Sequence, residues 1–246
     1  MKKLLYILVL SVIFNFGFKP KANASHYMGG EITWECLASG QFKFYLKYYR
    51  ECGGITFSTS SLTLESNSPA GNIYMAHQFG WPKDLTPTGK DITGCTLITC
   101  AWAEQTGIDN SGAVSEYYYV SSPVTINGVP PASGWTFYHE SCCRNPSTNL
   151  TSQPGWRLRA KMYPYNGQNT YPCYDNSPRF IEVARSVLTI GYPFTYNHNA
   201  IDVELDSLYY EWGQPLDNSG NIITSYAAGY AYNNPLPGPA QNVNNV

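Results

Sequence analysis

The chain contains 246 residues, of which 15% are aromatic and only 13% are charged, with 21 tyrosines, 6 tryptophans and a formal net charge of −2. A chain of such low and slightly acidic charge lacks the basic surface that binds nucleic acid, so nucleic acid is not an expected partner. Aromatic residues fit the pleated, half-buried surface of a sheet, and the composition therefore favours strands over helices.

The first 24 residues have the layout of a secretory signal peptide. Lys2 and Lys3 precede an apolar stretch over residues 4–18, and a small-x-small cleavage site follows at residues 22–24. The stretch is shorter than the ~20 residues that cross a bilayer, so we expect it to be removed and the mature chain to begin at Ser25. Because the peptide contains four of the 15 basic residues and no acid, 11 basic and 17 acidic residues remain, a net charge of −6. No later apolar run is long enough to span a membrane.

Alternation of apolar and polar residues predicts two long strands in the mature chain. The apolar face of the first, over residues 42–48, comprises Phe42, Phe44, Leu46 and Tyr48. The apolar face of the second, over residues 156–163, comprises Trp156, Leu158, Ala160 and Met162. Shorter runs typical of strands cover residues 31–36, 61–65, 116–120, 135–139, 180–183 and 208–212. No convincing helical period extends over ten residues.

Many short strands separated by turn-forming residues predict an all-β fold, an antiparallel β-sandwich of the immunoglobulin or cadherin type with disulfides. We expect a β-rich N-terminal domain over residues 25–177 and a cadherin- or immunoglobulin-like segment over residues 178–232. Residues 233–246, with three prolines and repeated asparagine, are typical of a linker. The Gly29-Gly30 pair precedes no helical pattern, so it indicates flexibility or a β-bulge and not a phosphate-binding loop.

Seven cysteines follow the predicted cleavage site, and structural disulfides fit the oxidising compartment that export implies. The odd number leaves at least one cysteine unpaired within the chain. If residues 31–36 and 41–51 form a hairpin that turns near residues 39–40, Cys36 and Cys52 lie ~30 Å apart at ~3.4 Å per residue, too far for a disulfide.

Other cysteines lie close together in the sequence. In an extended segment the adjacent Cys142 and Cys143 point to opposite faces, so we expect them to have different partners. Cys95 and Cys100 could close a small loop if the residues between them form a turn. Neither spacing is that of a zinc site. A nucleophile pair of Cys142 with His139 is a weak alternative, because a three-residue offset in a strand places the side chains on opposite faces.

Asp202, Glu204 and Asp206 are the candidate metal ligands. Carboxylate oxygens bind hard cations such as Ca²⁺, and these three share one side of the chain if the segment is extended. The residues alone favour a solvated acidic turn before the strand at residues 208–212, because no glycine supports a tight ion-binding loop. No other cofactor is expected.

The tyrosines and tryptophans allow two interpretations. Flat rings with a polar rim form stacking platforms for sugars, but such rings more commonly pack in the core or across strands. Catalytic signatures are weak: the sequence has no G-x-S-x-G, H-E-x-x-H or glycine-rich phosphate loop. Two carboxylates placed for glycoside hydrolysis cannot be identified from spacing. Binding is therefore expected in preference to catalysis.

Three phrases together resemble a known family. They are Ser-His-Tyr-Met-Gly-Gly-Glu-Ile at residues 25–32, Phe-Tyr-Leu-Lys-Tyr-Tyr-Arg-Glu-Cys at residues 44–52 and Ser-Cys-Cys-Arg-Asn at residues 141–145. The chain is similar to the N-terminal region of large secreted cell-surface proteins of gliding-type bacteria, and the similarity continues to residues 232–237. Those proteins commonly extend into PKD-like or other immunoglobulin-like repeats and end in a gliding-motility-associated C-terminal sorting domain.

The resemblance implies export, an extracellular or cell-surface location and an adhesive or structural role, with no established enzymatic activity for this region. The partners it implies are further domains of the same polypeptide and an unknown surface ligand, protein or glycan. The family's acidic phrase has the form A-x-D-x-D-G-D-S-L of cadherin-like calcium-binding modules, from which Glu204 and Leu205 depart. The family also tends to have a cysteine just before the Pro193-Phe194 phrase, and its absence here fits the odd cysteine count.

We therefore expect a non-catalytic surface or adhesin module that forms the N-terminal part of a larger exported protein. A carbohydrate-binding module of a secreted polysaccharide-processing protein is the alternative. A secreted hydrolase that uses unidentified acids is a third possibility.

Overall fold

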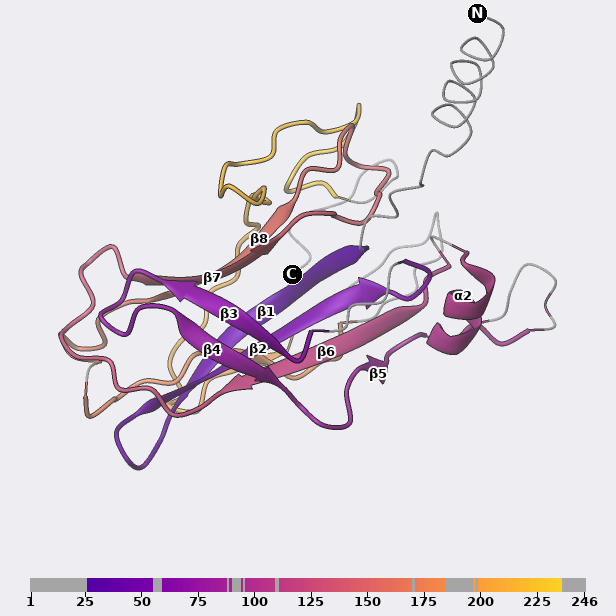
Figure 1. Cartoon of the computed structure of the whole chain (residues 1–246). Helices are drawn as coiled ribbons and strands as arrows, with labels where there is room; N and C mark the ends of the chain where they lie inside the picture. Colours follow the sequence, from indigo (N-terminus) through magenta and orange to yellow (C-terminus); the bar gives the residue numbers. More distant parts are fainter. Residues whose placement is uncertain are drawn as a thin grey trace, which may run out of the picture.

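The computed structural model describes residues 26–54, 59–87, 89, 94, 96–108, 111–169, 171–184, 197 and 199–235. The predicted signal peptide, Cys95 and most of the predicted linker lie outside the described residues. The described part of the chain is all-β and antiparallel, as predicted, and contains one short helix (Figure 1). Across these ranges, no helix is long and apolar enough to cross a membrane.

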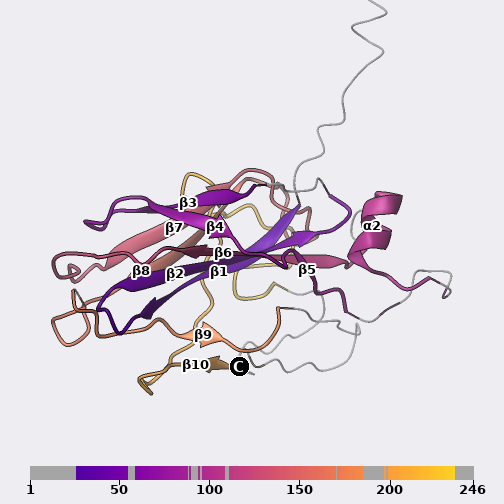
Figure 2. The same ribbon diagram turned by 60° about the horizontal axis from the view of Figure 1, so that its bottom comes forward.

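One curled sheet forms most of the molecule. The elements in chain order are β1 (Tyr27–Cys36), β2 (Phe42–Glu51), β3 (Ser61–Ser66), β4 (Ile73–His77), β5 (Lys83–Asp84), α2 (Cys100–Thr106), β6 (Val114–Ser121), β7 (Trp135–Ser141), β8 (Trp156–Met162), β9 (Arg179–Phe180) and β10 (Ala200–Ile201). The strand order of the sheet is β1-β2-β6-β4-β3-β7-β8, with β5 paired to β6. The sheet curls until β8 contacts β1, so β3 and β7 form a second layer over β1 and β2 (Figures 1 and 2). β9 and β10 pair separately on the outer side of β1 and β2 (Figure 2).

The core between the two layers is built from the face that alternation predicts. The four apolar side chains of this face of β2 are fully buried: Phe42, Phe44, Leu46 and Tyr48. Phe137 of β7 lies 4.6 Å from Phe44 and 6.2 Å from Trp34, measured between ring centroids. Each such side chain contributes about 1.5–3 kcal/mol when it leaves water. A one-residue slip of β2 would expose this whole face, so the pattern fixes the register.

β1 and β2 form the predicted hairpin, and Cys36 and Cys52 are not joined, as predicted. Cys36 is instead bonded to Cys173, 137 residues later in the chain. The segment after Cys173 continues beside β1, where Ser177 N–H donates to Trp34 O at 3.1 Å. This disulfide therefore attaches the C-terminal part of the chain to the first strand.

The Gly29-Gly30 pair forms a bulge, as predicted, and a close contact between strands. The register of β1 shifts between Tyr27 and Gly29. A Cβ atom at Gly30 would lie 2.3 Å from the carbonyl oxygen of Lys47 in β2 and 2.7 Å from Leu158 Cδ1 in β8. Only glycine allows the three strands to approach this closely, and this approach closes the curled sheet.

Six predicted strands appear as β1, β2, β3, β6, β7 and β8, whereas two predictions at the C-terminal side are wrong. In the run at residues 180–183 only Phe180 belongs to a strand, and residues 208–212 form none. Ile181, Val183 and Tyr209 are exposed, so their apolar faces meet no core and stabilise no strand. The short strands β4 and β5 have no counterpart among the predictions.

The boundary between residues 25–177 and 178–232 stays a prediction. Among the described residues of the second part, only β9 and β10 are strands. Loops of this part form hydrogen bonds to the loop that follows β7, such as Ala227 N–H to Asn149 O at 3.0 Å. The two parts thus meet beside the end of β7.

Candidate functional site: a pocket beside Tyr27

Tyr27, at the start of β1, lies between two arginines. It pairs with Arg50 of β2 on one side and forms a parallel bridge with Arg144, which follows β7, on the other. Tyr27 N–H donates to Cys143 O at 3.4 Å, and Asn145 N–H donates to Tyr27 O at 2.8 Å. The two arginines therefore occupy neighbouring backbone positions, but their side chains have different surroundings.

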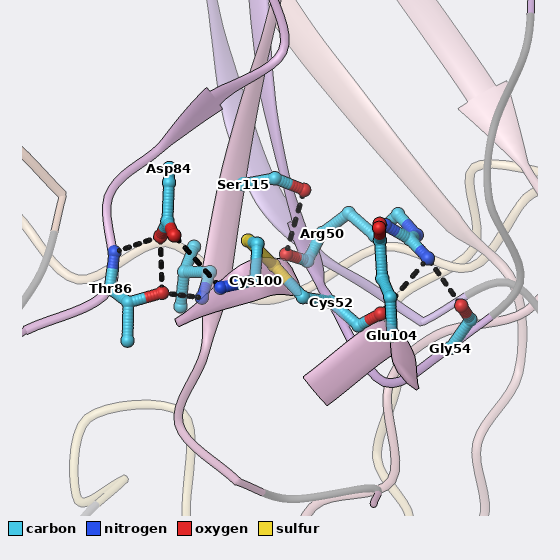
Figure 3. Close-up of polar contacts among 9 residues, drawn as sticks. Arg50, Cys52, Gly54, Asp84, Thr86, Cys100, Glu104 and Ser115 are labelled. Carbon is cyan, nitrogen blue, oxygen red and sulfur yellow. Dashed lines mark hydrogen bonds and ion pairs between the residues drawn. A yellow bond between two sulfur atoms is a disulfide. The ribbon is translucent and has the colours of Figure 1, made fainter. Parts of the chain in front are cut away.

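Arg50 is fully buried and is surrounded by hydrogen-bond acceptors. Its Nη1 donates to Glu104 Oε1 of α2 at 3.2 Å, and its Nη2 donates to the carbonyl oxygen atoms of Cys52, at 3.2 Å, and Gly54 (Figure 3). The Cys52–Cys100 disulfide fastens α2 to the end of β2. A buried cation that is paired and hydrogen-bonded in this way is a structural element of the fold.

Helix α2 begins at a fixed position beside this arginine. Thr99 caps its first turn by accepting a hydrogen bond from Trp102 N–H at 3.1 Å. Asp84 of β5 accepts from Cys100 N–H at 2.8 Å and from the N–H and hydroxyl of Thr86 (Figure 3). Burial alone would raise the pKa of Asp84, but these hydrogen bonds hold it below its usual value. The polar groups around α2 thus satisfy one another.

Arg144 lines a pocket of about 390 Å³, which we call the Arg144 pocket. The start of β1, the loop over residues 144–150 and the segment over residues 212–235 form its walls. Its aromatic lining comprises Tyr27, Trp212, Tyr226 and Tyr232. Trp212 is 44% exposed and Tyr232 is 36% exposed, so both rings can contact a ligand at the surface. Small-molecule sites in proteins usually have volumes of about 300–1,000 Å³.

Hydrogen bonds between the three segments hold the walls of the Arg144 pocket. Arg144 Nη2 donates to Leu216 O at 2.9 Å and to Gly155 O at 3.4 Å. Asn149 Nδ2 donates to Pro235 O at 3.3 Å. Together with the bonds between Tyr27 and residues 143 and 145, these contacts position the guanidinium group before any ligand binds.

Several polar groups of the Arg144 pocket lack a partner among the described residues. Arg144 Nε, Asn145 Oδ1 and Tyr226 Oη are enclosed and form no hydrogen bond. Burial lowers the pKa of Arg144; burial also raises the pKa of Tyr226, while the charge of Arg144 acts in the opposite direction. A buried polar group without a hydrogen bond costs about 1–3 kcal/mol. Three such groups lie in the walls of the Arg144 pocket, so these walls are polar as well as aromatic.

The predicted metal ligands Asp202, Glu204 and Asp206 lie in a bend after β10 and not in an extended segment. Asp206 N–H donates to Asp202 Oδ1 at 3.1 Å, and Asn176 Nδ2 donates to Glu204 Oε1. Burial, followed by the charges of Glu204, Asp202 and Asp206, raises the pKa of Asp175 to about 6. The structure therefore brings a fourth acid to the three that the sequence singles out.

In the part of the chain that the structure describes, no group of three or more histidine, cysteine, aspartate and glutamate side chains is arranged to hold a metal ion. Calcium binding by Asp202, Glu204 and Asp206 stays a prediction. The acidic segment leads into a loop and not into the predicted strand, and this loop brings Trp212 to the Arg144 pocket.

The cysteine pairing corrects one prediction about adjacent residues. Cys142 and Cys143 are bonded to each other and not to different partners. β7 ends before them, and Cys143 has a φ of 73°, in the left-handed region, so the pair is not extended and the two sulfur atoms can meet. Cys142 consequently has no free thiol for a nucleophile pair with His139.

The small loop that Cys95 and Cys100 could close by their spacing is not formed. Cys100 is bonded to Cys52 and not to Cys95. Helix α2 begins at Cys100 and directs it towards the end of β2, 48 residues earlier in the chain. The three disulfides use six of the seven cysteines, in line with the predicted odd cysteine, and the seventh, Cys95, lies outside the described residues.

The residues of the Arg144 pocket carry no role in the sequence interpretation. Arg144 and Asn145 belong to one of the phrases of the resemblance, and Trp212 belongs to a wrongly predicted strand. The Cys-Cys-Arg-Asn phrase is the one signal that could have directed attention to this place. No protein family, curated protein or solved structure matches the chain.

Proposed function

We propose that this protein is a non-catalytic binding module of a bacterial cell-surface protein and that it holds a saccharide in the Arg144 pocket. The observation that carries the proposal is the combination of half-exposed rings with amide side chains in one preformed pocket. Trp212 and Tyr232 offer flat apolar surface, whereas Asn145 and Asn149 offer amide groups. Pyranose rings have both an apolar face and a rim of hydroxyl groups, so this lining suits them.

Two further features support export and surface display. Three disulfides join described cysteines, which fits folding in an oxidising compartment. The resemblance to N-terminal regions of secreted surface proteins of gliding-type bacteria adds adhesion as the role of the binding. Adhesion to a glycan combines the two functions expected from the sequence, a surface adhesin module and a carbohydrate-binding module.

A panel of neutral and acidic oligosaccharides, screened on an array and measured by calorimetry, tests this proposal. Trp212→Ala should weaken binding of any retained saccharide by about tenfold or more, since an aromatic anchor commonly contributes more than about 1.4 kcal/mol. Tyr74→Ala is the matched control, because Tyr74 of β4 is an exposed ring outside the pocket. Binding of no saccharide contradicts the proposal, and hydrolysis of any bound saccharide favours the hydrolase instead.

A further inference from the structure

We infer that the Arg144 pocket recognises an acidic saccharide, a sugar that carries a carboxylate such as a hexuronate, through the guanidinium group of Arg144. This inference rests on the proposed function, because it names the class of saccharide that the same pocket binds. Its basis is the charge inside the pocket, the free donors of Arg144 and the distribution of rings and amides around them.

Charge is distributed unevenly between the pocket and the rest of the chain. After the predicted cleavage site the chain has a net charge of −6. Of the residues that line the Arg144 pocket, Arg144 alone is charged. Among the described residues, no carboxylate forms an ion pair with it. A half-buried cation without an anion is costly, and a ligand carboxylate would supply the missing charge.

Arg144 has donors that remain available to a ligand. Its Nη2 is fixed by Leu216 O and Gly155 O, which holds the plane of the guanidinium group. Its Nη1 forms no hydrogen bond with described residues and is not among the enclosed atoms, whereas Nε is enclosed without a partner. Nη1 can therefore donate to a ligand carboxylate, and a hydrogen bond in which both partners are charged is stronger than one to a neutral hydroxyl group.

The remaining lining determines what else the ligand contains. A simple anion would use Arg144 alone and would leave the rings of Trp212 and Tyr232 and the amides of Asn145 and Asn149 without a role. A hexuronate uses all of them, since its carboxylate meets Arg144 while its ring and hydroxyl groups meet aromatic and amide side chains. The pocket therefore favours a sugar acid over a neutral sugar and over a bare anion.

Calorimetry with three related probes tests the inference. The probes are an unsubstituted hexuronate trisaccharide, its methyl ester and a neutral hexose trisaccharide. We expect the free acid to bind roughly ten- to hundredfold more tightly than the other two, because a hydrogen bond to a charged group contributes about 1.5–3 kcal/mol. Arg144→Gln should remove this preference, and Arg144→Lys, which keeps the charge but loses the hydrogen bonds that fix the guanidinium group, should retain part of it.

Arg159→Gln is the matched control, because Arg159 of β8 is an exposed arginine whose side chain makes no hydrogen bond or ion pair with described residues. It should leave all three affinities unchanged, and circular dichroism checks that each variant is folded. Equal binding of acid, ester and neutral sugar overturns the inference and leaves saccharide binding standing. Failure of all three saccharides overturns both proposals, and so does binding of a peptide with a free terminal carboxylate in their place.

Discussion

Arg50 and Arg144 flank the same residue, Tyr27, yet the protein uses the two side chains in different ways. Arg50 is enclosed by Glu104 and two backbone carbonyls, and the disulfide that holds α2 keeps these acceptors in position. Arg144 keeps the Nη1 atom of its guanidinium group for the pocket and has no anionic partner among the described residues. A cation whose acceptors are all within the protein stabilises the fold, whereas one with free donors can bind a ligand.

Removal of Arg50, the structural member of this pair of arginines, should have the largest effect on the free energy of unfolding. Arg50→Met leaves the carbonyl oxygen atoms of Cys52 and Gly54 without their donor, which costs about 1–3 kcal/mol each and about 2–6 kcal/mol together; Glu104 is 45% exposed, so the loss of its partner adds little. We expect the free energy of unfolding, measured by urea denaturation, to fall by this amount. Arg159→Met provides the control on an exposed arginine. A loss below about 1 kcal/mol would mean that Arg50 has no structural role.

The disulfides permit a second test, with a somewhat smaller expected effect. Replacing Cys36 and Cys173 by alanine opens a cross-link between residues 137 positions apart and should lower stability by about 2–5 kcal/mol. The same exchange at Cys142 and Cys143 opens no chain loop, so we expect a loss below about 1 kcal/mol. Thermal melts without reductant measure both. Similar losses in the two double variants would contradict this explanation.

Replacement of Arg144 should affect stability much less than replacement of Arg50, as expected for a residue that binds a ligand. Arg144→Gln removes the hydrogen bonds to Leu216 O and Gly155 O, but it also removes an enclosed Nε that has no partner. We expect the free energy of unfolding to change by about 1 kcal/mol or less. The measurement is urea denaturation beside Arg50→Met under identical conditions. A loss as large as that of Arg50→Met would make Arg144 a structural residue as well.

Asp175 shows how charge acts where carboxylates repel one another. Its pKa rises from 3.8 to about 6, first through burial and then through Glu204, Asp202 and Asp206. The folded state thus holds this proton more tightly than the unfolded chain, so the stability gained is fully present below about pH 4 and is lost as the pH rises through about 6. With allowance for solvent screening, Asp175→Asn should raise the free energy of unfolding at pH 7 by about 1 kcal/mol.

Urea denaturation at pH 4 and pH 7 checks this sign. The wild type should lose stability between these values relative to Asp175→Asn. Equal pH dependence of the two proteins would show that the pKa of Asp175 is not raised in the folded state.

Calcium should have the smallest effect, and it depends on the same acids. If Asp202, Glu204 and Asp206 bind Ca²⁺ with a dissociation constant of ~10⁻⁴–10⁻³ M, 0.5 mM calcium stabilises the folded state by about 0.2–1 kcal/mol. The melting temperature in calcium should then exceed that in chelator, and Asp206→Asn should abolish the difference. Identical melts of the wild type in both buffers would identify the segment as a solvated acidic turn.

The regular part of the fold could be predicted from the sequence, because alternation is a local property. The apolar positions of β2 and β8 and the hairpin that separates Cys36 from Cys52 follow from period-two patterns and turn residues. The conformation of the loops after β8 does not follow from local alternation. Residues 208–212 form a run typical of a strand, but they pair with no described strand, and Trp212 lines the pocket instead.

The Arg144 pocket could not be predicted because its walls come from three segments that are far apart in the sequence. Tyr27, Arg144 and Trp212 meet only after the sheet has curled and the C-terminal loops have settled beside β7. Local signals describe each segment separately. The prediction that Cys142 and Cys143 have different partners was wrong for a related reason. It assumed an extended chain, whereas Cys143 has a positive φ.

The Cys36–Cys173 disulfide also determines how the protein carries tension. A pull on the two ends of the described chain passes from β1 through the sulfur atoms to the C-terminal segment and bypasses everything between them. The bond thereby keeps roughly 450–490 Å of extended chain from being drawn out, at about 3.3–3.6 Å per residue. Strands β2 to β8 lie in this mechanically shielded stretch, whereas β1 and the third wall of the Arg144 pocket, residues 212–235, lie on the loaded path. Under shear the loops of this wall would therefore yield before strands β2 to β8.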